Sequence, residues 1–357
     1  LGVEVVVSDP TADAPASPVV RDQLVGGFDD RDTLMELAER SDFLTFEIEL
    51  VDPDVLKEVS EASGVPVHPA PDTLRTIQDK LVQKKRLRNA GVSVPEFRGV
   101  NSAEEVREAL DELGYPGMLK ARQGGYDGRG NVLIESPQEV EDAFDSISGP
   151  AMVEEVVEFE RELAVMGCIG AEGTDCFPVT ETVHEEEILR STVSPPRADE
   201  ERCREARGVA NRVLEVMEGR GVYGIELFDT GEDILLNEIA PRPHNSGHWT
   251  IEGCQTSQFE QHVRAVTGQP LGSTERRSST ATANLLGDVD ERGRAELHGD
   301  RQVLETPRAH LHWYGKREVY HLRKMGHITV VGKKDDATTQ VLDSVRNLRD
   351  ECSFEVI

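Results

Sequence analysis

Short apolar runs and helix-like spacings of apolar residues take turns over the first seventy residues. Runs typical of strands occur at residues 3–7, 42–47 and 65–68, and spacings typical of helices occur at residues 31–40 and 53–63. Strands that alternate with helices in this way favour a parallel sheet covered on both faces. We therefore predict an N-terminal α/β domain over residues 1–73, in which residues 3–7 form a buried strand.

After residue 73 the helices and strands follow a different order. Helices are predicted at residues 74–90, 102–113, 137–147, 199–218 and 256–267. Strands dominate between residues 117 and 239, and a further strand is predicted at residues 282–286. This mixture predicts an α+β architecture in two more domains, over residues 74–270 and 271–357.

The segment 224–238 is typical of a β-hairpin, because two alternating apolar runs flank the turn at residues 229–233. If the hairpin centres near residue 232, Glu226 and Glu238 lie opposite each other on one face, with Cβ atoms roughly 5 Å apart. Two carboxylates so placed repel each other unless a cation lies between them. Mg²⁺ is the expected cation, because it takes carboxylate oxygens together with substrate phosphates. Asn237 can share the ion only if the strand bends or ends there.

A second candidate site follows a short apolar strand that carries Lys120. The loop after this strand contains Gly124, Gly125, Gly128 and Gly130. Glycines let backbone N–H groups approach an anion, and a lysine before such a loop supplies a point charge for phosphate. Because the loop joins strand to strand, it is neither a Walker loop nor a Rossmann turn, which both precede a helix. An ordinary glycine-rich hairpin loop is an equal alternative at this point.

The composition is strongly acidic. The 357 residues include 68 acidic and 39 basic residues, and the formal net charge is −29. Such a surface argues against nucleic acids and anionic membranes as partners, although local basic groups can still hold an anionic substrate. A highly charged surface over an ordinary core is typical of proteins that work in high salt, where screening removes the self-repulsion. We therefore predict a halophilic protein, with an acidic mesophilic enzyme as the alternative.

The five cysteines are odd in number and have no CxxC spacing, which argues against a disulfide framework and against a zinc site. They are expected to be reduced thiols of a cytoplasmic protein. The sequence contains neither a signal peptide nor an apolar run of about 18 residues that would span a membrane. It starts at Leu1, directly before the first predicted strand, and this start predicts a domain entered partway.

Three motifs, in this order, resemble those of ATP-grasp ligases, and within them the 5-(carboxyamino)imidazole ribonucleotide synthase family of purine biosynthesis. They are GGYDGRG at 124–130, NEIAPRPHNSGHW at 237–249, and HLHWYGK at 310–316 with RKMGH at 323–327. The resemblance implies an ATP-grasp fold with an N-terminal parallel α/β (pre-ATP-grasp) domain and a small C-terminal domain that completes the ribonucleotide site. The family's first strand and Gly-Gln-Leu-Gly turn would precede Leu1. We therefore expect an N-terminally truncated domain, whose extension would restore solubility and ribonucleotide affinity.

The resemblance implies that ATP is held between two α+β lobes together with Mg²⁺. The residues that would contact ATP are Lys80, Lys120, Gly125, Tyr126, Asp127, Gly128, Arg129, Gly130, Asn131, Glu154, Glu155, Val156, Val157, Glu162, His184, Asn237 and Glu238. Residues 125–131 would lie over the phosphates, residues 154–157 would bind the adenine through backbone groups and one carboxylate, and Glu162 would hold the ribose. Lys80 stands where the family often has arginine. Glu226 and Glu238 match the Mg²⁺ ligands, in agreement with the hairpin.

The second substrate implied by the resemblance is aminoimidazole ribonucleotide. Tyr126, Asp127 and Arg129 would face it, and Lys316 and Arg323 would bind its phosphate. Asp127 is the candidate acid/base group near the reacting amine, and Lys316 is the candidate residue that tunes it.

The third substrate implied by the resemblance is bicarbonate, for which Arg242 and His244 are the candidate catalytic residues. Arginine suits a planar oxyanion, because its fork donates two parallel hydrogen bonds. His248 and Trp249 are expected to brace this loop, and His312 is expected to pack or cap rather than react.

The implied reaction is the ATP-dependent carboxylation of the exocyclic amine of aminoimidazole ribonucleotide with bicarbonate, which yields ADP and phosphate. Bicarbonate would attack the γ-phosphate of ATP, and the amine would then capture the resulting carboxyphosphate, or CO₂ released from it. Such an enzyme is expected to be a cytoplasmic homodimer that passes its product to the mutase of the pathway, without nucleic acid or membrane partners. The alternatives are another ATP-grasp ligase, such as formate-dependent glycinamide ribonucleotide transformylase, and a nucleotide-binding protein without catalysis.

Overall fold

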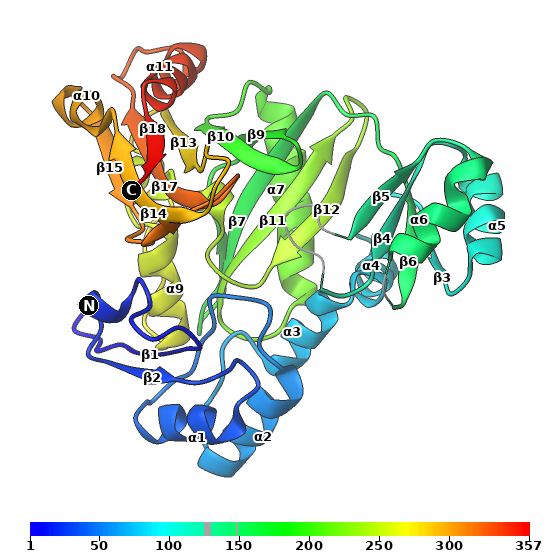
Figure 1. The fold of residues 1–357 in the computed structure, drawn as a ribbon, viewed down its shortest axis with the longest axis horizontal. Helices are drawn as coiled ribbons and strands as arrows, with labels where there is room; N and C mark the ends of the chain where they lie inside the picture. Colours follow the sequence, from blue (N-terminus) through cyan, green and yellow to red (C-terminus); the bar gives the residue numbers. More distant parts are fainter. Residues whose placement is uncertain (125–129, 148) are drawn as a thin grey trace.

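The computed structural model describes residues 1–124, 130–147 and 149–357. Figure 1 shows an N-terminal region of short strands and helices, a small sheet at the opposite end of the view, and a long sheet between them that continues into the C-terminal region. The fold is α/β at its N-terminal end and α+β elsewhere, as predicted. No helix in the three ranges is both long enough and apolar enough to cross a membrane.

The N-terminal region combines two parallel strands with several helices. Its elements are β1 (Val6–Asp9), η1 (Ser17–Val19), β2 (Asp22–Val25), α1 (Arg31–Glu39), α2 (Pro53–Ser63) and α3 (Pro71–Gln78). Asp52 caps α2 by accepting hydrogen bonds from the N–H groups of Asp54 and Val55, and Gly64 ends it in the left-handed conformation at φ 74°. These caps explain why α2 occupies the residues that the apolar spacing predicted.

The first strand differs from the prediction. β1 begins at Val6 and is half-buried, whereas Val3 and Val5 are 42% and 47% exposed. The prediction of a buried strand at residues 3–7 is therefore wrong. In the described part of the chain β1 pairs with β2 alone, and a two-stranded sheet covers too little of each strand to bury it.

The strands predicted at residues 42–47 and 65–68 are reduced to a single parallel bridge between Leu44 and Val67. Both side chains are buried in the N-terminal core, as their apolar character predicted. The ladder does not extend, because Pro66 and Pro69 on either side of Val67 have no N–H group to donate.

The small sheet is antiparallel and contains, in order, β3 (Phe97–Val100), β6 (Ala151–Glu155), β4 (Gly117–Ala121) and β5 (Asn131–Ile134). The helices associated with it are α5 (Ala103–Leu113), η2 (Pro137–Glu139) and α6 (Val140–Ser146). α5 buries Val106 and Leu110 against Leu119 of β4 and Val153 of β6. The preceding helix, α4 (Lys80–Asn89), lies between this sheet and β12 of the long sheet (Figure 1).

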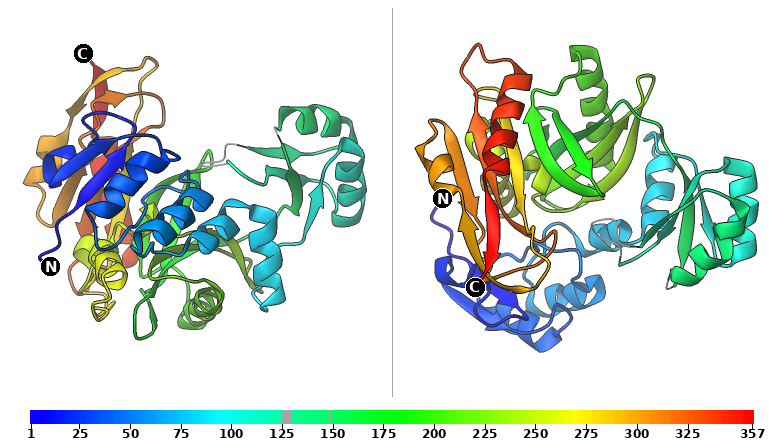
Figure 2. Two further views of the ribbon diagram at one scale, coloured as in Figure 1. Left: turned by 90° about the horizontal axis from the view of Figure 1, so that it is seen from below. Right: turned by 45° about the horizontal axis from the view of Figure 1, so that its top comes forward.

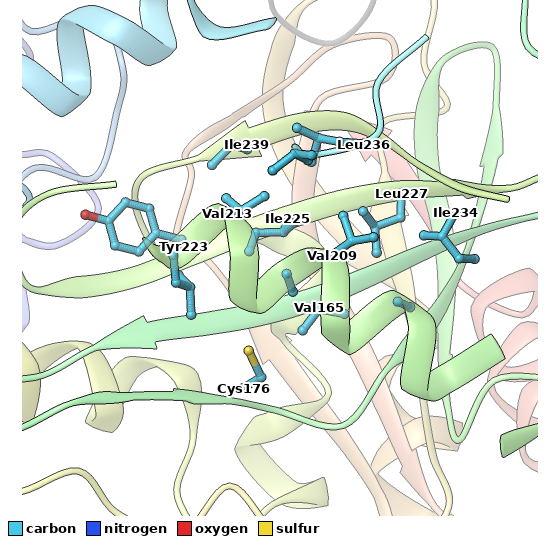
Figure 3. Close-up of a cluster of buried hydrophobic side chains, with 14 of the residues drawn as sticks. Val165, Cys176, Val209, Val213, Tyr223, Ile225, Leu227, Ile234, Leu236 and Ile239 are labelled. Atoms are coloured by element: carbon cyan, nitrogen blue, oxygen red, sulfur yellow. The ribbon is translucent and has the colours of Figure 1, made fainter. Parts of the chain in front are cut away.

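The long sheet has nine strands in the order β12-β11-β7-β9-β10-β13-β17-β15, with β8 paired to β7. Their bounds are β7 (Arg161–Ile169), β8 (Thr174–Cys176), β9 (Thr180–Glu185), β10 (Ile188–Ser194), β11 (Gly221–Asp229), β12 (Ile234–Ala240), β13 (Thr280–Leu286), β15 (Ala309–Trp313) and β17 (Lys324–Val331). α7 (Glu200–Val216) packs across one face, where Val209 and Val213 meet Val165, Ile225 and Leu236 (Figure 3). This core holds the strands that carry the candidate site.

The C-terminal region completes the long sheet and adds a short one. Its further elements are η3 (Asn245–Gly247), α8 (Thr250–Gly253), α9 (Gln258–Val266), β14 (Gly293–His298), α10 (Asp300–Glu305), β16 (Glu318–Val319), α11 (Thr338–Asp350) and β18 (Ser353–Val356). Because β10 pairs with β13, the long sheet contains strands from both sides of residue 270, where the sequence predicted a domain boundary. Figure 2 shows the N-terminal and C-terminal regions side by side, and Arg317 Nη2 lies 3.4 Å from Asp13 Oδ2 between them.

Candidate active site

The predicted carboxylate pair is present, because Glu226 on β11 lies directly opposite Glu238 on β12. Next to this pair the register shifts by one residue, and Asn237 becomes the extra residue of a bulge in β12. The bulge is the kind of bend that the sequence required for Asn237 to share the site with Glu238. The hairpin prediction is therefore confirmed.

The surroundings of the two carboxylates favour a cation between them. Lys80 Nζ lies 2.9 Å from Glu238 Oε1. Burial raises the pKa of Glu226 to about 7, which the charge of His184 opposes and that of Glu238 reinforces. Burial also acts on Glu238, but the ion pair with Lys80 outweighs it and lowers the pKa of that carboxyl.

This donor set fits Mg²⁺. Within the described ranges, no group of three or more His, Cys, Asp or Glu side chains is arranged to hold a metal ion. Mg²⁺ bound with a nucleotide typically takes only one or two carboxylates and completes its shell with phosphate oxygens and water. Glu226 and Glu238 match that requirement, and an all-protein cage is not needed.

Lys120 on β4 and Lys84 on α4 share one buried carboxylate, that of Glu154 on β6. Lys84 Nζ lies 2.5 Å from Glu154 Oε1, and Lys120 Nζ donates a hydrogen bond to Glu154 Oε2. Burial lowers the pKa of Lys84 to about 8, against the opposing charge of Glu154. Burial acts on Glu154 as well, but the two ammonium groups outweigh it and lower the pKa of the carboxyl, so the cluster is ionised at neutral pH.

Residues 154–157, which were predicted to bind the adenine, differ in their surroundings. The Glu154 side chain points into the protein toward its two lysines, and Glu155 Oε1 accepts a hydrogen bond from Glu96 N–H at 2.8 Å. Val156 is exposed and Val157 is half-buried. Both carboxylates of this segment are therefore already engaged by other groups of the protein.

Lys84 is the residue of this cluster that the sequence analysis missed. It lies one helical turn after Lys80 on α4, and residues four apart share one face of a helix. The spacing predicts that Lys84 shares a helix face with Lys80, but it does not predict which lysine of a strongly charged helix is buried.

Glu162 on β7 and His184 on β9 are neighbours, with His184 Nδ1 2.8 Å from Glu162 Oε2. Burial lowers the pKa of His184, but the hydrogen bond to Glu162 and the charge of Glu226 outweigh it and raise that pKa. Phe228 on β11 pairs with Glu162 and stacks on Phe159 at 4.9 Å between ring centroids. Glu162, the residue predicted to hold the ribose, therefore lies next to an aromatic surface and on a strand that pairs with the strand of Glu226.

Arg242 joins the motif after β12 to the N-terminal region. Its Nε lies 2.9 Å from Glu49 Oε1, in an ion pair without hydrogen-bond alignment, and its Nη1 donates to Pro243 O at 3.0 Å. The guanidinium group is therefore held by Glu49, a residue that the sequence analysis did not select.

His244 packs tightly against β11. A Cβ atom at Gly224 would lie 2.5 Å from His244 Cβ, so glycine is required for this approach. His244 Nδ1 lies 2.8 Å from Ser246 Oγ and 3.7 Å from Glu226 Oε1. Burial, reinforced by the charge of Arg242, keeps the pKa of His244 well below its usual value, so the ring is neutral at physiological pH.

One side-chain amide, that of Gln258, holds the backbone of His244 from both sides. His244 N–H donates to Gln258 Oε1 at 2.9 Å, and Gln258 Nε2 donates to His244 O at 2.7 Å. The same Nε2 lies 3.1 Å from His248 Nδ1. The sequence analysis also missed Gln258, which is fully buried at the start of α9.

Three residues that were expected to brace the loop or to pack, His248, Trp249 and His312, make packing contacts in the structure. Trp249 is buried, and His248 stacks on His327 at 4.7 Å between ring centroids. His312 stacks on the other side at 4.4 Å from His327, and its Nε2 lies 2.8 Å from Glu252 Oε1. These contacts pack the motif at residues 241–250 against His327 on β17, which in turn stacks on His312 of β15.

The predicted phosphate-binding pair lies in the C-terminal region. Lys316 Nζ donates to Lys324 O at 2.8 Å, and the Arg323 guanidinium donates to Glu318 O at 2.6 Å. Glu47, another residue missed from sequence, lies close enough to Lys316 and Arg242 to interact with their charges. Burial raises the pKa of Glu47, while the charges of Arg242 and Lys316 oppose that rise.

Five predicted site residues, Gly125, Tyr126, Asp127, Gly128 and Arg129, lie outside the described residues. Gly130 and Asn131 follow directly. Gly130 O accepts a hydrogen bond from Ala121 N–H at 2.7 Å, and Asn131 pairs with Lys120 across β4 and β5. The strands before and after the glycine-rich segment, β4 and β5, therefore pair with each other at Lys120.

Comparison with known families divides the chain into three matches. Residues 1–78 match the ribonucleotide synthetase preATP-grasp domain, residues 85–259 the ATP-grasp domain, and residues 280–341 the phosphoribosylaminoimidazole carboxylase C-terminal domain.

Comparison with individual proteins agrees with these matches. N5-carboxyaminoimidazole ribonucleotide synthase of Brucella melitensis is 39% identical over 92% of the chain and 90% of its own length. The N5-carboxyaminoimidazole ribonucleotide synthetase structure from Thermotoga maritima superposes with a TM-score of 0.89 at 40% identity, covering 100% of this chain and 94% of its own. An Aspergillus clavatus synthase solved with ADP and 5-aminoimidazole ribonucleotide has a TM-score of 0.87 at 32% identity, covering 97% and 92%.

The chain also matches longer proteins over part of their length. It spans 66%, 63% and 60% of the phosphoribosylaminoimidazole carboxylases of Schizosaccharomyces pombe, Ogataea methanolica and Candida albicans.

Proposed function

Because the chain belongs to the N5-carboxyaminoimidazole ribonucleotide synthase family of ATP-grasp proteins, we propose that it uses ATP to carboxylate 5-aminoimidazole ribonucleotide with bicarbonate. The observation that supports the proposal is the carboxylate pair Glu226 and Glu238, with Lys80 beside Glu238 and His244 beside Glu226. We propose that Lys80 binds phosphate here, and that His244 binds bicarbonate together with Arg242.

The nucleotide would lie between the small sheet and the long sheet. Lys120 and Lys80 would neutralise its phosphates, and Glu162 with His184 would hold the ribose. Bound Mg²⁺, held by Glu226 and Glu238 with Asn237 beside them, would withdraw charge from the transferring phosphoryl group. Lys80 pairs with Glu238, Lys120 with Glu154, and His184 with Glu162 in the structure, and these pairs support the proposal.

Bicarbonate would bind between Arg242 and His244. The Arg242 guanidinium can donate parallel hydrogen bonds to two oxygens of the ion, and its ion pair with Glu49 holds it in place. A neutral His244 can accept the proton of bicarbonate or donate to one of its oxygens. A bicarbonate oxygen would attack the γ-phosphorus, the bond to ADP would break, and carboxyphosphate would form.

The exocyclic amine of the ribonucleotide would then attack the carboxyl carbon of carboxyphosphate, or CO₂ released from it, and inorganic phosphate would leave. Lys316 and Arg323 would hold the ribonucleotide phosphate, and Tyr126 and Arg129 would face its ring. The amine must lose a proton in this step, and we assign its transfer to Asp127, with Lys316 as the neighbouring cation.

The test is a phosphate-release assay with single omissions. We expect release of phosphate only when ATP, 5-aminoimidazole ribonucleotide and bicarbonate are all present, with one carboxyamino product per ADP. Support of turnover by formate and glycinamide ribonucleotide would instead identify a transformylase. Tight binding of ADP without phosphate release under any combination would identify a nucleotide-binding protein without catalysis.

We also propose finer properties that follow from the family and the composition. They are a requirement for Mg²⁺, a homodimeric state, a cytoplasmic location, an acidic surface adapted to high salt, and delivery of the product to a mutase. Support for the salt adaptation comes from the formal net charge of −29. The thiols support a reducing location, because Cys168, Cys176 and Cys254 are buried free cysteines.

A further inference from the structure

Lys84 is enclosed at the junction of the small sheet and the long sheet, between which the nucleotide is proposed to bind. Its side chain is 4% exposed, and its ammonium group lies 2.5 Å from Glu154 Oε1 on β6. The same group donates to Leu236 O on β12 at 3.1 Å. A single cation therefore connects the small sheet to the strand that carries Glu238.

Glu154 distributes its charge between two lysines. One carboxylate oxygen faces Lys84 and the other accepts a hydrogen bond from Lys120. In the described part of the chain Oε1 has no hydrogen-bond partner besides this ion pair. The exposed fractions are 4% for Lys84, 2% for Glu154 and 16% for Lys120, so only Lys120 can reach a ligand in the cleft.

We propose that Lys84 is a positioning residue for the nucleotide, which acts by sharing the Glu154 carboxylate so that Lys120 keeps positive charge available for phosphate. The inference rests on the proposed binding of ATP in this cleft. With Lys84 present, two ammonium groups face one carboxylate, and the cluster carries a net positive charge. Without it, Lys120 and Glu154 neutralise each other, and Lys120 must leave a buried carboxylate in order to contact a phosphate.

A positioning role and a purely structural role of Lys84 predict different ligand affinities when Glu154 is replaced as well. If Lys84 only stabilises the fold, replacing Glu154 as well removes another buried interaction and cannot improve ligand binding. If Lys84 acts through the charge of Glu154, a neutral group of the same shape at position 154 releases Lys120. The double variant then regains the affinity that the single variant lost.

The experiment measures ADP binding by isothermal titration calorimetry, which needs no turnover. We expect Lys84→Met to weaken ADP binding about tenfold or more, as expected for loss of a charge-assisted contact. Lys84→Met/Glu154→Gln should return to within about threefold of the wild type, a difference of less than about 1 kcal/mol. The matched control is Lys85→Met, the same change at the next position of α4, where the side chain is exposed; it should bind ADP like the wild type.

Two results would overturn the inference: unchanged ADP affinity in Lys84→Met, or a double variant that binds no better than the single one. Failure of the wild type to bind ADP would instead refute the proposed function. Circular dichroism and thermal melts establish that each variant is folded. If Lys84→Met does not fold, the same comparison is made with Lys84→Gln, whose amide can still donate to Leu236 O while removing the charge.

Discussion

Replacement of Gln258 by leucine should separate the positioning of His244 from the stability of the fold. The Gln258 amide accepts from His244 N–H at 2.9 Å and donates to His244 O at 2.7 Å. Leucine has a similar volume but can make neither bond. The change therefore leaves His244 N–H without its partner and removes one of the two hydrogen bonds to His244 O, which Gly247 N–H still contacts at 2.9 Å. It frees one side of the loop that carries the imidazole.

The expected loss of stability can be worked out from these two bonds. The N–H group left without a partner costs about 1–3 kcal/mol, and the hydrogen bond lost at His244 O, which keeps Gly247 N–H, costs about 1 kcal/mol, so the total is about 2–4 kcal/mol. At about 2–4 °C per kcal/mol, the melting temperature should fall by roughly 5–15 °C. Displacement of a substrate-positioning residue by about 1 Å can cost on the order of a hundredfold in rate. We therefore expect the KM for bicarbonate to rise at least about tenfold, with little change in the KM for ATP.

The chain offers a matched control in Gln261, one turn later on the same helix. Gln261 Nε2 donates to Gly272 O and its Oε1 accepts from Gly272 N–H, both at 2.8 Å. Gln261→Leu therefore removes the same two kinds of bond from a partly buried backbone, but at Gly272 rather than at His244. Both variants should lose similar stability, and only Gln258→Leu should change the bicarbonate KM. Equal bicarbonate KM values in the two variants would refute the positioning of His244 by Gln258.

Three further predictions concern the charges of the site and of the surface. Glu238→Gln removes a charge proposed to hold Mg²⁺, with little change in volume, so turnover should fall by about a hundredfold or more while the circular dichroism spectrum is retained; near-normal turnover would sink the assignment, and Glu187→Gln on an exposed turn is the control. Arg242→Lys keeps the charge but loses the planar fork, so the KM for bicarbonate should rise far more than that for ATP, and equal changes would make Arg242 structural. The melting temperature should rise with KCl beyond about 1 M, where screening of surface charge is complete, and a melting temperature independent of salt would remove the halophilic interpretation.

The parts of the site that could be predicted from the sequence are local in the chain. Glu226 and Glu238 belong to one hairpin, whose turn and apolar alternation bring the two residues close together, while the bulge at Asn237 sets them directly opposite each other. Strand prediction failed where proline interrupted an apolar run, as at Pro66 and Pro69, because the pattern of side chains does not count missing backbone donors. Most helices were predicted well because their apolar spacing and caps lie within single segments. The single helix predicted at residues 74–90 was wrong: Asp79 is extended and caps a new helix, so α3 (Pro71–Gln78) and α4 (Lys80–Asn89) are separate.

The sequence by itself determined which chemical groups are available and which face of an element carries them. It could not determine that Lys84 meets Leu236, 152 residues away, or that Glu154 turns away from the cleft toward two lysines. It also left Glu47 and Gln258 unnoticed, because their partners lie on other elements. Only the tertiary structure decided these contacts, since periodicity specifies the face of a helix or strand, whereas the packing of distant elements specifies what that face touches. Which charged groups surround Lys120 depends on that packing, and for this reason only the tertiary structure shows how the residues predicted from the sequence lie relative to one another.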